Sequence, residues 1–188
     1  MKTLSTDVEI CRAKRDQLPE ILALLEVCQL PKEGLATHLS KTLVAQRGNE
    51  IVGCSALEVY QELALLRSVA VKPSLRRRGL GLKLTRAALD LARESHITNV
   101  YLLTETATTF FSKLGFTQVS RSDVPETIKR SVEFTTLCPK TATVMTLGLT
   151  QLTPRGTFFH SARACPTPSL DCRWSNLEGG RTGPGLLP

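Results

Sequence analysis

Residues 65–85, LLRSVAVKPSLRRRGLGLKLT, decide the fold of this chain. An apolar run of the kind found in β-strands breaks at Lys72-Pro73. A turn rich in arginine and glycine follows, and residues 79–95 then carry apolar side chains at helical spacing. The stretch therefore predicts a strand, a basic turn and a long amphipathic helix in direct succession.

The basic turn has the chemistry of an anion-binding site. The first turn of a helix offers unpaired backbone N–H groups and a partial positive charge to a phosphate. The turn lacks the Gly-Lys-Ser/Thr ending of a P-loop and the three glycines of the dinucleotide fingerprint, so nucleotide hydrolysis and hydride transfer lose support. We predict a pyrophosphate site made by the bare backbone of the glycines and the charge of the arginines: Arg76, Arg77, Arg78, Gly79, Leu80 and Gly81.

A second block completes the pattern. Residues 99–116, NVYLLTETATTFFSKLGF, predict a buried strand, a short helix and a Leu-Gly-Phe stop. With the RxxGxG turn at residues 76–81, and in this order and spacing, the chain resembles the GNAT N-acetyltransferases, whose turn binds the pyrophosphate of an acyl-coenzyme A. The runs LALLRSVAV, YLLTETATTFF and LCPKTATVM narrow the resemblance to a subgroup encoded in arsenic-resistance operons. The resemblance covers residues 8–149.

The fold class predicted is α/β, with a mixed sheet. The resemblance implies the GNAT acyl-CoA N-acyltransferase fold, in which a mostly antiparallel sheet is splayed between two parallel strands. Residue patterns agree, because residues 42–46, 50–60 and 63–71 are strand-like runs separated by short turns, which predicts three consecutive antiparallel strands. Residues 99–103 follow a helical crossover, so this apolar strand should lie parallel to its predecessor.

Composition limits the class of protein. A chain of 188 residues suggests one domain, placed at residues 1–150. The formal net charge is +7, but the basic residues are spread along the chain and aromatic residues make up 5%, which argues against a nucleic-acid partner. The N-terminal residues lack the apolar core of a signal peptide, and no run approaches the ~20 apolar residues of a membrane span. We expect a cytoplasmic protein without a membrane partner, with a homodimer left open.

The remaining residues, 151–188, differ in composition. They hold five of the ten prolines and five of the twelve glycines without a sustained apolar period. Such a segment buries too little apolar surface to offset the entropy of ordering, which predicts a disordered tail. The cysteines and histidines show neither a CxxC pair nor metal-ligand spacing, so no metal is expected.

The resemblance implies acetyl-CoA as the cosubstrate and places it along the splayed strands. A backbone N–H near the end of the first splayed strand would stabilise the oxyanion of the thioester carbonyl. Many enzymes of the family carry a tyrosine where this chain has Phe111, and phenylalanine cannot protonate the departing thiolate. Beyond the basic turn, the expected cofactor-binding residues are Val69, Ala70, Val71, Thr104, Phe110 and Phe111.

Two carboxylates are candidates for the general base that deprotonates the amine. Glu58 is the one charged residue in IVGCSALEVY, and a two-residue turn at 61–62 would place it diagonally across from Arg67, roughly 7 Å away or less. Arg67 could then bind the carboxylate of an acceptor, although an internal ion pair between neighbouring strands fits equally well. Glu105 follows the second splayed strand, where a helix-start role is the alternative.

The function predicted is acetyl transfer from acetyl-CoA to the amine of a small amino-acid-like acceptor, with an arsenical amino acid among the candidates. The alternative is a GNAT-fold protein that binds acetyl-CoA as a sensor and has weak or no turnover. It is motivated by Phe111 and by the two competing base assignments. Release of free thiol with a panel of acceptors would distinguish the two.

Overall fold

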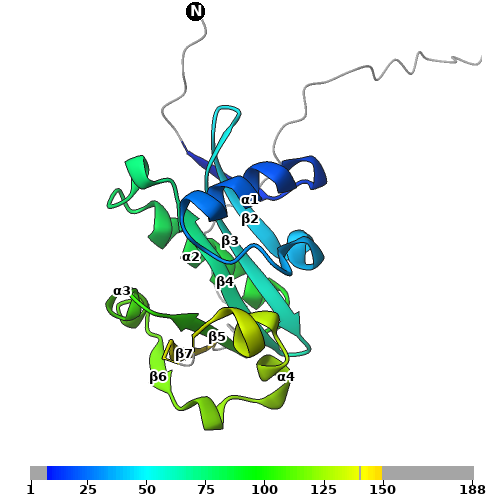
Figure 1. Ribbon diagram of the computed structural model, residues 1–188, viewed down its shortest axis with the longest axis vertical. Helices are drawn as coiled ribbons and strands as arrows, with labels where there is room; N and C mark the ends of the chain where they lie inside the picture. The colour runs from blue at the N-terminus through cyan, green and yellow to red at the C-terminus, as the bar shows by residue number, and fades with distance from the viewer. Residues whose placement is uncertain (1–7, 140, 150–188) are drawn as a thin grey trace, which may run out of the picture.

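The computed structural model describes residues 8–139 and 141–149, and the predicted tail at 151–188 lies outside this range. Within the described residues, one seven-stranded sheet runs through the molecule in the order β1-β2-β3-β4-β5-β7-β6 (Figure 1). The strands are β1 (Glu9–Arg12), β2 (Thr42–Arg47), β3 (Glu50–Tyr60), β4 (Leu63–Val71), β5 (Asn99–Thr104), β6 (Thr117–Val119) and β7 (Thr143–Gly148). The helices are α1 (Leu18–Val27), α2 (Leu80–Glu94), α3 (Thr108–Ser112) and α4 (Glu126–Lys129).

The predicted mixed sheet is confirmed. Strands β1 to β4 are antiparallel neighbours, and β7 lies antiparallel between β5 and β6. Short turns join β2 to β3 and β3 to β4, whereas residues 13–41, which include α1, join β1 to β2. The β4–β5 pair is parallel, because the chain returns to the sheet through α2. Its register covers Leu63↔Asn99, Ala64↔Val100 and Leu65↔Tyr101, and the strands diverge beyond this point.

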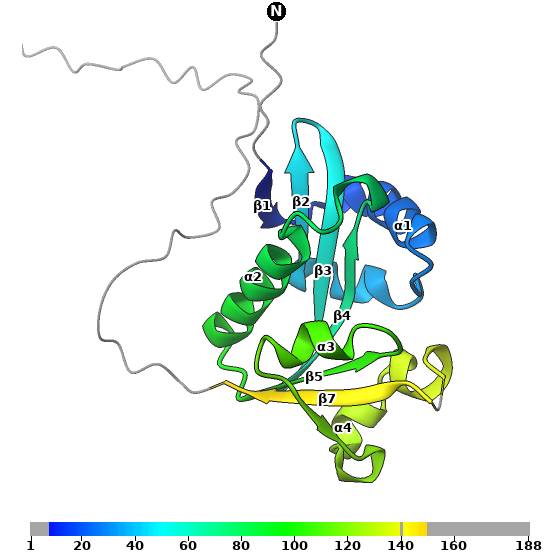
Figure 2. The same ribbon diagram turned by 90° about the vertical axis from the view of Figure 1, so that its left-hand side faces the viewer.

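Helices cover both faces of the sheet, as Figure 2 shows for α1 and α2. The buried side chains of α1 form one core with Val44, Cys54 and Ala56 of the sheet. α4 packs on Leu65 and Val144. On the opposite face α2 and α3 share a core with Leu57 and other sheet residues. The predicted apolar stripe of α2 is buried as expected, at Leu80, Leu84, Ala88 and Leu91.

A bulge bends β4 where the strands diverge. The register steps from Ala56↔Arg67 to Cys54↔Ala70, so two residues of β4 lie opposite one of β3. Ser68 has φ +54°, a left-handed conformation that L-residues other than glycine rarely adopt. Bulges re-aim the strand that carries them, and this one directs residues 69–71 away from β5.

Other short helical segments complete the fold. A 3₁₀ helix at Leu35–Lys41 lies against β3. A π-helical turn at Glu133–Leu137 follows α4. Within the described part of the chain, no helix is long and apolar enough to cross a bilayer.

The contact between β3 and α2 is tight enough to test. A Cβ added at Gly53 would lie 2.8 Å from Leu84 Cδ1 and 3.0 Å from the Ala70 carbonyl oxygen. We predict that Gly53→Ala lowers the free energy of unfolding by about 1–3 kcal/mol through overpacking. Urea unfolding measures the loss. Gly148→Ala is the control, because its added Cβ would make ordinary contact at 3.9 Å; equal losses in the two variants would contradict the packing argument.

Candidate active site

The divergence of β4 and β5 opens a cleft of about 730 Å³. Its walls are the second half of β4, the end of β5, the first turn of α2, and α3. The turn after α1, residues 133–139 and Ala142 complete its lining. Eight of the predicted cofactor-binding residues line this cleft: Val69, Ala70, Val71, Arg76, Gly81, Thr104, Phe110 and Phe111.

The basic turn lies at one end of the cleft, at the N-terminus of α2. Gly79 is the N-cap and has φ +79°, a value that suits glycine, and Arg77 also has positive φ at +63°. Arg76 Nε donates to the Val71 carbonyl oxygen at 3.1 Å, which fixes the turn against the end of β4. The remaining predicted residues, Arg77, Arg78, Gly79 and Leu80, lie in the same turn beside the lining residues, and Leu80 is buried in the core.

Aromatic rings form the wall beside α3. The rings of Phe110 and Phe111 meet edge to face with centroids 5.0 Å apart, and Phe111 also contacts Phe116 at 5.7 Å. Phe111 is 7% exposed and belongs to the main core. Its side chain therefore packs between core and cleft and offers no proton.

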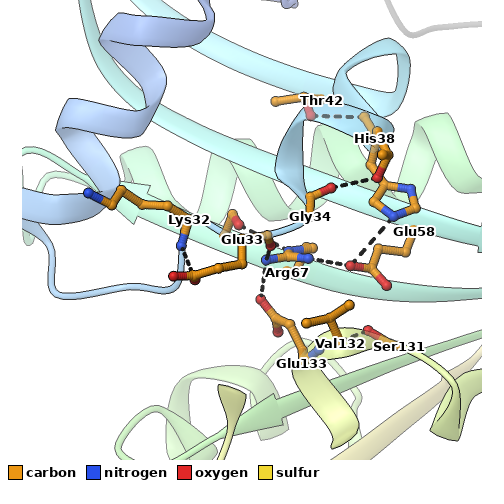
Figure 3. Close-up of polar contacts among 12 residues, drawn as sticks. Lys32, Glu33, Gly34, His38, Thr42, Glu58, Arg67, Ser131, Val132 and Glu133 are labelled. Atoms are coloured by element: carbon orange, nitrogen blue, oxygen red, sulfur yellow. Dashed lines mark hydrogen bonds and ion pairs between the residues drawn. The ribbon is translucent and has the colours of Figure 1, made fainter. Parts of the chain in front are cut away.

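A buried ion cluster lies at another part of the cleft wall (Figure 3). The fully buried guanidinium of Arg67 pairs through Nη1 with Glu58 Oε1. Its Nη2 lies 2.9 Å from Glu133 Oε1 and donates to the Glu33 carbonyl oxygen at 2.8 Å. The predicted diagonal placement of Glu58 and Arg67 is confirmed, because Arg67 is opposite Ala56 in the register.

Glu58 is buried behind Arg67 and is held as a carboxylate. Burial by itself would raise its pKa, but hydrogen bonds from Ser131 and Tyr60 and the pairing with Arg67 bring the pKa below its ordinary value. Tyr60 Oη donates to Glu58 Oε2 at 2.8 Å. His38 Nε2 lies 3.7 Å from Glu58 Oε1, and burial lowers its pKa despite the nearby carboxylate. Glu58 thus fixes Arg67 and does not line the cleft.

Two other carboxylates reach the cleft. Glu105 lines it from the turn between β5 and α3, where its side chain is exposed. Glu133 lines it from the π-helical turn and is 6% exposed. Burial raises the pKa of Glu133 to about 7, with Arg67 acting against this shift and Glu58 adding to it. Sequence reasoning missed Glu133; the available signal was a lone carboxylate in the run SVEFTTL.

The comparisons with known proteins agree with this geometry. Residues 38–118 match the model of the acetyltransferase (GNAT) domain. The uncharacterized N-acetyltransferase CT2212 of Chlorobaculum tepidum is 30% identical over 109 residues, which is 57% of this chain and 68% of that protein. The chain belongs to the GNAT family of acetyltransferases. It is an acetyltransferase whose cosubstrate is acetyl-CoA.

Two further proteins are similar to this GNAT chain. The amino-acid acetyltransferase of Neisseria meningitidis (serogroup A) is 26% identical over 132 residues, which is 65% of this chain but 30% of that protein. The solved structure of Rv2747 from Mycobacterium tuberculosis, in complex with CoA and a second ligand, superposes with a TM-score of 0.65 at 25% identity. That match covers 75% of this chain and 99% of Rv2747.

The glycine at the mouth of the cleft gives the first test of the cofactor site. A Cβ at Gly81 would meet Val71 Cγ2 at 3.8 Å and Phe110 Cζ at 3.9 Å, so the fold accepts a side chain there. We predict that Gly81→Val weakens acetyl-CoA binding by roughly tenfold or more, because branched methyl groups keep the phosphates off the backbone. Calorimetric titration measures the affinity. The melting temperature should stay within a few degrees; unchanged affinity in the folded variant would refute the assignment.

Arg76 gives a second test. If its guanidinium makes a charge-assisted bond to a phosphate, Arg76→Ala should cost about 1.5–3 kcal/mol of acetyl-CoA binding. The matched control is Arg86→Ala, because Arg86 is an exposed arginine of α2 outside the cleft. Equal affinities of the two variants would show that Arg76 is an ordinary solvated turn residue.

Proposed function

We propose that this enzyme transfers the acetyl group of acetyl-CoA to the primary amine of a small, amino-acid-like acceptor. The observation that carries the proposal is the arrangement of charge in the cleft. Arginine and helix N–H groups lie at the turn before α2. Another part of the lining holds one arginine, Arg67, and two carboxylates, Glu105 and Glu133. The first set suits a pyrophosphate, and the second suits a zwitterion that carries an amine and a carboxylate.

The thioester would lie between these two regions, along residues 69–71 of β4. The bulge at Ser68 turns this segment away from β5 while Ala70 and Val71 stay paired with β3, so backbone N–H groups on the β5 side could reach a carbonyl oxygen in the cleft. A backbone N–H placed there would stabilise the oxyanion that forms when the amine attacks. Phe110 and Phe111 would pack against the pantetheine arm.

Arg67 is the residue that we propose for the acceptor's carboxylate. It is among the residues that line the cleft, its Nη2 is shared by Glu133 and the Glu33 carbonyl, and its Nη1 is held by Glu58. Glu58 would fix the guanidinium plane, and Glu105 would lie at the cleft surface. The name of the Neisseria relative, an amino-acid acetyltransferase, supports an acceptor of this class. The resemblance to arsenic-operon enzymes adds an arsenical amino acid to the candidates.

An acceptor screen tests the proposed function. Release of free coenzyme A would be measured with L-amino acids, with the amine formed by decarboxylation of each, and with an arsenical amino acid. We expect turnover with at least one amino acid and a higher kcat/KM than for its decarboxylated partner. Acetyl-CoA binding without thiol release for any acceptor would instead support the sensor alternative.

The role of Arg67 is tested by Arg67→Lys, which keeps the charge but loses the planar fork. We predict a rise of roughly 10- to 100-fold in the acceptor KM, the equivalent of a charge-assisted bond of about 1.5–3 kcal/mol. The KM for acetyl-CoA should change little. A lowered melting temperature with an unchanged acceptor KM would show that Arg67 serves Glu58 and Glu133 alone.

A further inference from the structure

Glu133 lines the cleft beside Arg67. The π-helical turn that carries it closes one side of the cleft, and its carboxylate reaches Arg67 Nη2 at 2.9 Å. Because we place the acceptor's carboxylate on the same guanidinium, the α-amine of that acceptor, two bonds away from its carboxylate carbon, would lie next to Glu133. Glu133 occupies on Arg67 the place that an acceptor's carboxylate would take.

The charges around Glu133 keep the protonated and ionised forms of its carboxyl group close in free energy. Arg67 carries one positive charge, and both Glu58 and Glu133 contact it. Glu58 has additional hydrogen bonds from Tyr60 and Ser131, so it keeps the negative charge more readily. The titratable or charged groups around the pair come from several elements: Arg67 of β4, Glu58 of β3, His38 of the 3₁₀ helix, Glu105 after β5, and Cys138 and Arg121 beside the π-helical turn.

The other two carboxylates are less suited to this task. Glu58 is 1% exposed and lies behind Arg67, away from the cleft lining. Glu105 is exposed on its turn, so solvent surrounds its side chain. Glu133 combines access to the cleft, burial from water and a fixed position, which are the properties of an efficient general base.

We infer that Glu133 is the general base of this acetyltransferase, an inference that rests on the proposed function. The acceptor's carboxylate replaces Glu133 on Arg67 Nη2, and the freed Glu133 carboxylate takes one proton from the acceptor's ammonium group. The neutral amine then attacks the thioester carbonyl carbon, so that a C–N bond forms and the C–S bond breaks. The second amine proton leaves with the thiolate as free coenzyme A thiol, and Glu133 returns its proton to water.

The test is the pH dependence of kcat/KM in wild type, Glu133→Gln and Glu133→Asp, each with the L-amino acids of the screen. A base must be unprotonated, so wild-type kcat/KM should rise through a midpoint near the pKa of about 7 and level off above it. Glu133→Gln should lose this limb and fall by roughly 10²- to 10⁴-fold at pH 8. Glu133→Asp, which keeps the carboxylate, should keep the limb at a reduced rate.

Variants at three other carboxylates accompany the test. Glu126→Gln changes a carboxylate of α4 that is 80% exposed and should keep the wild-type profile. A Glu133→Gln variant that folds, binds acetyl-CoA and retains the limb would overturn the inference and leave the proposed function standing. Loss of the limb in Glu105→Gln or Glu58→Gln instead would also overturn it. Absence of turnover in wild type with every acceptor would refute the proposed function itself.

A stability measurement shows whether Glu133 titrates as the geometry implies, without any acceptor. The folded chain holds the proton of Glu133 up to about pH 7, whereas the unfolded chain releases it near the ordinary pKa of 4.5. The folded state therefore binds more protons between these values, and stability should fall as pH rises through this window. We expect Glu133→Gln to lack this part of the fall in melting temperature. Parallel pH curves for the two proteins would contradict the placement of Glu133 and, with it, the inference.

Discussion

The early end of the parallel pairing between β4 and β5 is the constraint on which the rest of this structure depends. The register stops at Leu65 and Tyr101, and the bulge at Ser68 then turns β4 away. β5 tolerates the loss of its neighbour because β7 remains paired with it from Asn99 to Thr104. The sheet thus keeps its hydrogen bonds on one side of β5 while it opens on the other. This opening is the cleft in which we propose that acetyl-CoA binds.

The bulge has a second consequence, because it follows directly after Arg67. Arg67 lies on the same face as Glu58, with α1 and α4 packed over neighbouring residues of that face. A guanidinium so deeply buried is tolerated only with close partners, and here two carboxylates and the Glu33 carbonyl supply them. One positive charge between two carboxylates cannot satisfy both equally. Glu58 and Glu133 therefore compete for the charge of Arg67, and the packing that brings them together influences the protonation state of Glu133.

The two parts of the cleft are built by different physical means. The turn before α2 depends on backbone conformation. Its glycines leave the backbone open, and together with the helix N-terminus they suit an anion with few side-chain contacts. The region around Arg67 uses side chains from four separate elements, each fixed by burial or hydrogen bonds. A cosubstrate common to a family suits a site made of backbone groups, such as the turn before α2. An acceptor that differs among family members suits a site made of side chains, such as the region around Arg67, since substitutions there leave the sheet intact.

The amino-acid sequence by itself determined the class of fold, the strands and helix around residues 65–85, and the basic turn between them, because these depend on local periodicity and on glycine and arginine at fixed spacing. It also determined the diagonal placement of Glu58 and Arg67, since a two-residue turn at 61–62 fixes the register of β3 and β4. Tertiary structure alone decided the bulge at Ser68 and the approach of Glu133 to Arg67. Residues 67 and 133 are far apart in the chain and belong to no common repeat, so their contact follows from how α4 and the π-helical turn pack on the sheet. The pKa of Glu133 was equally beyond the sequence, because it is set by burial and by neighbours that only the folded chain brings together.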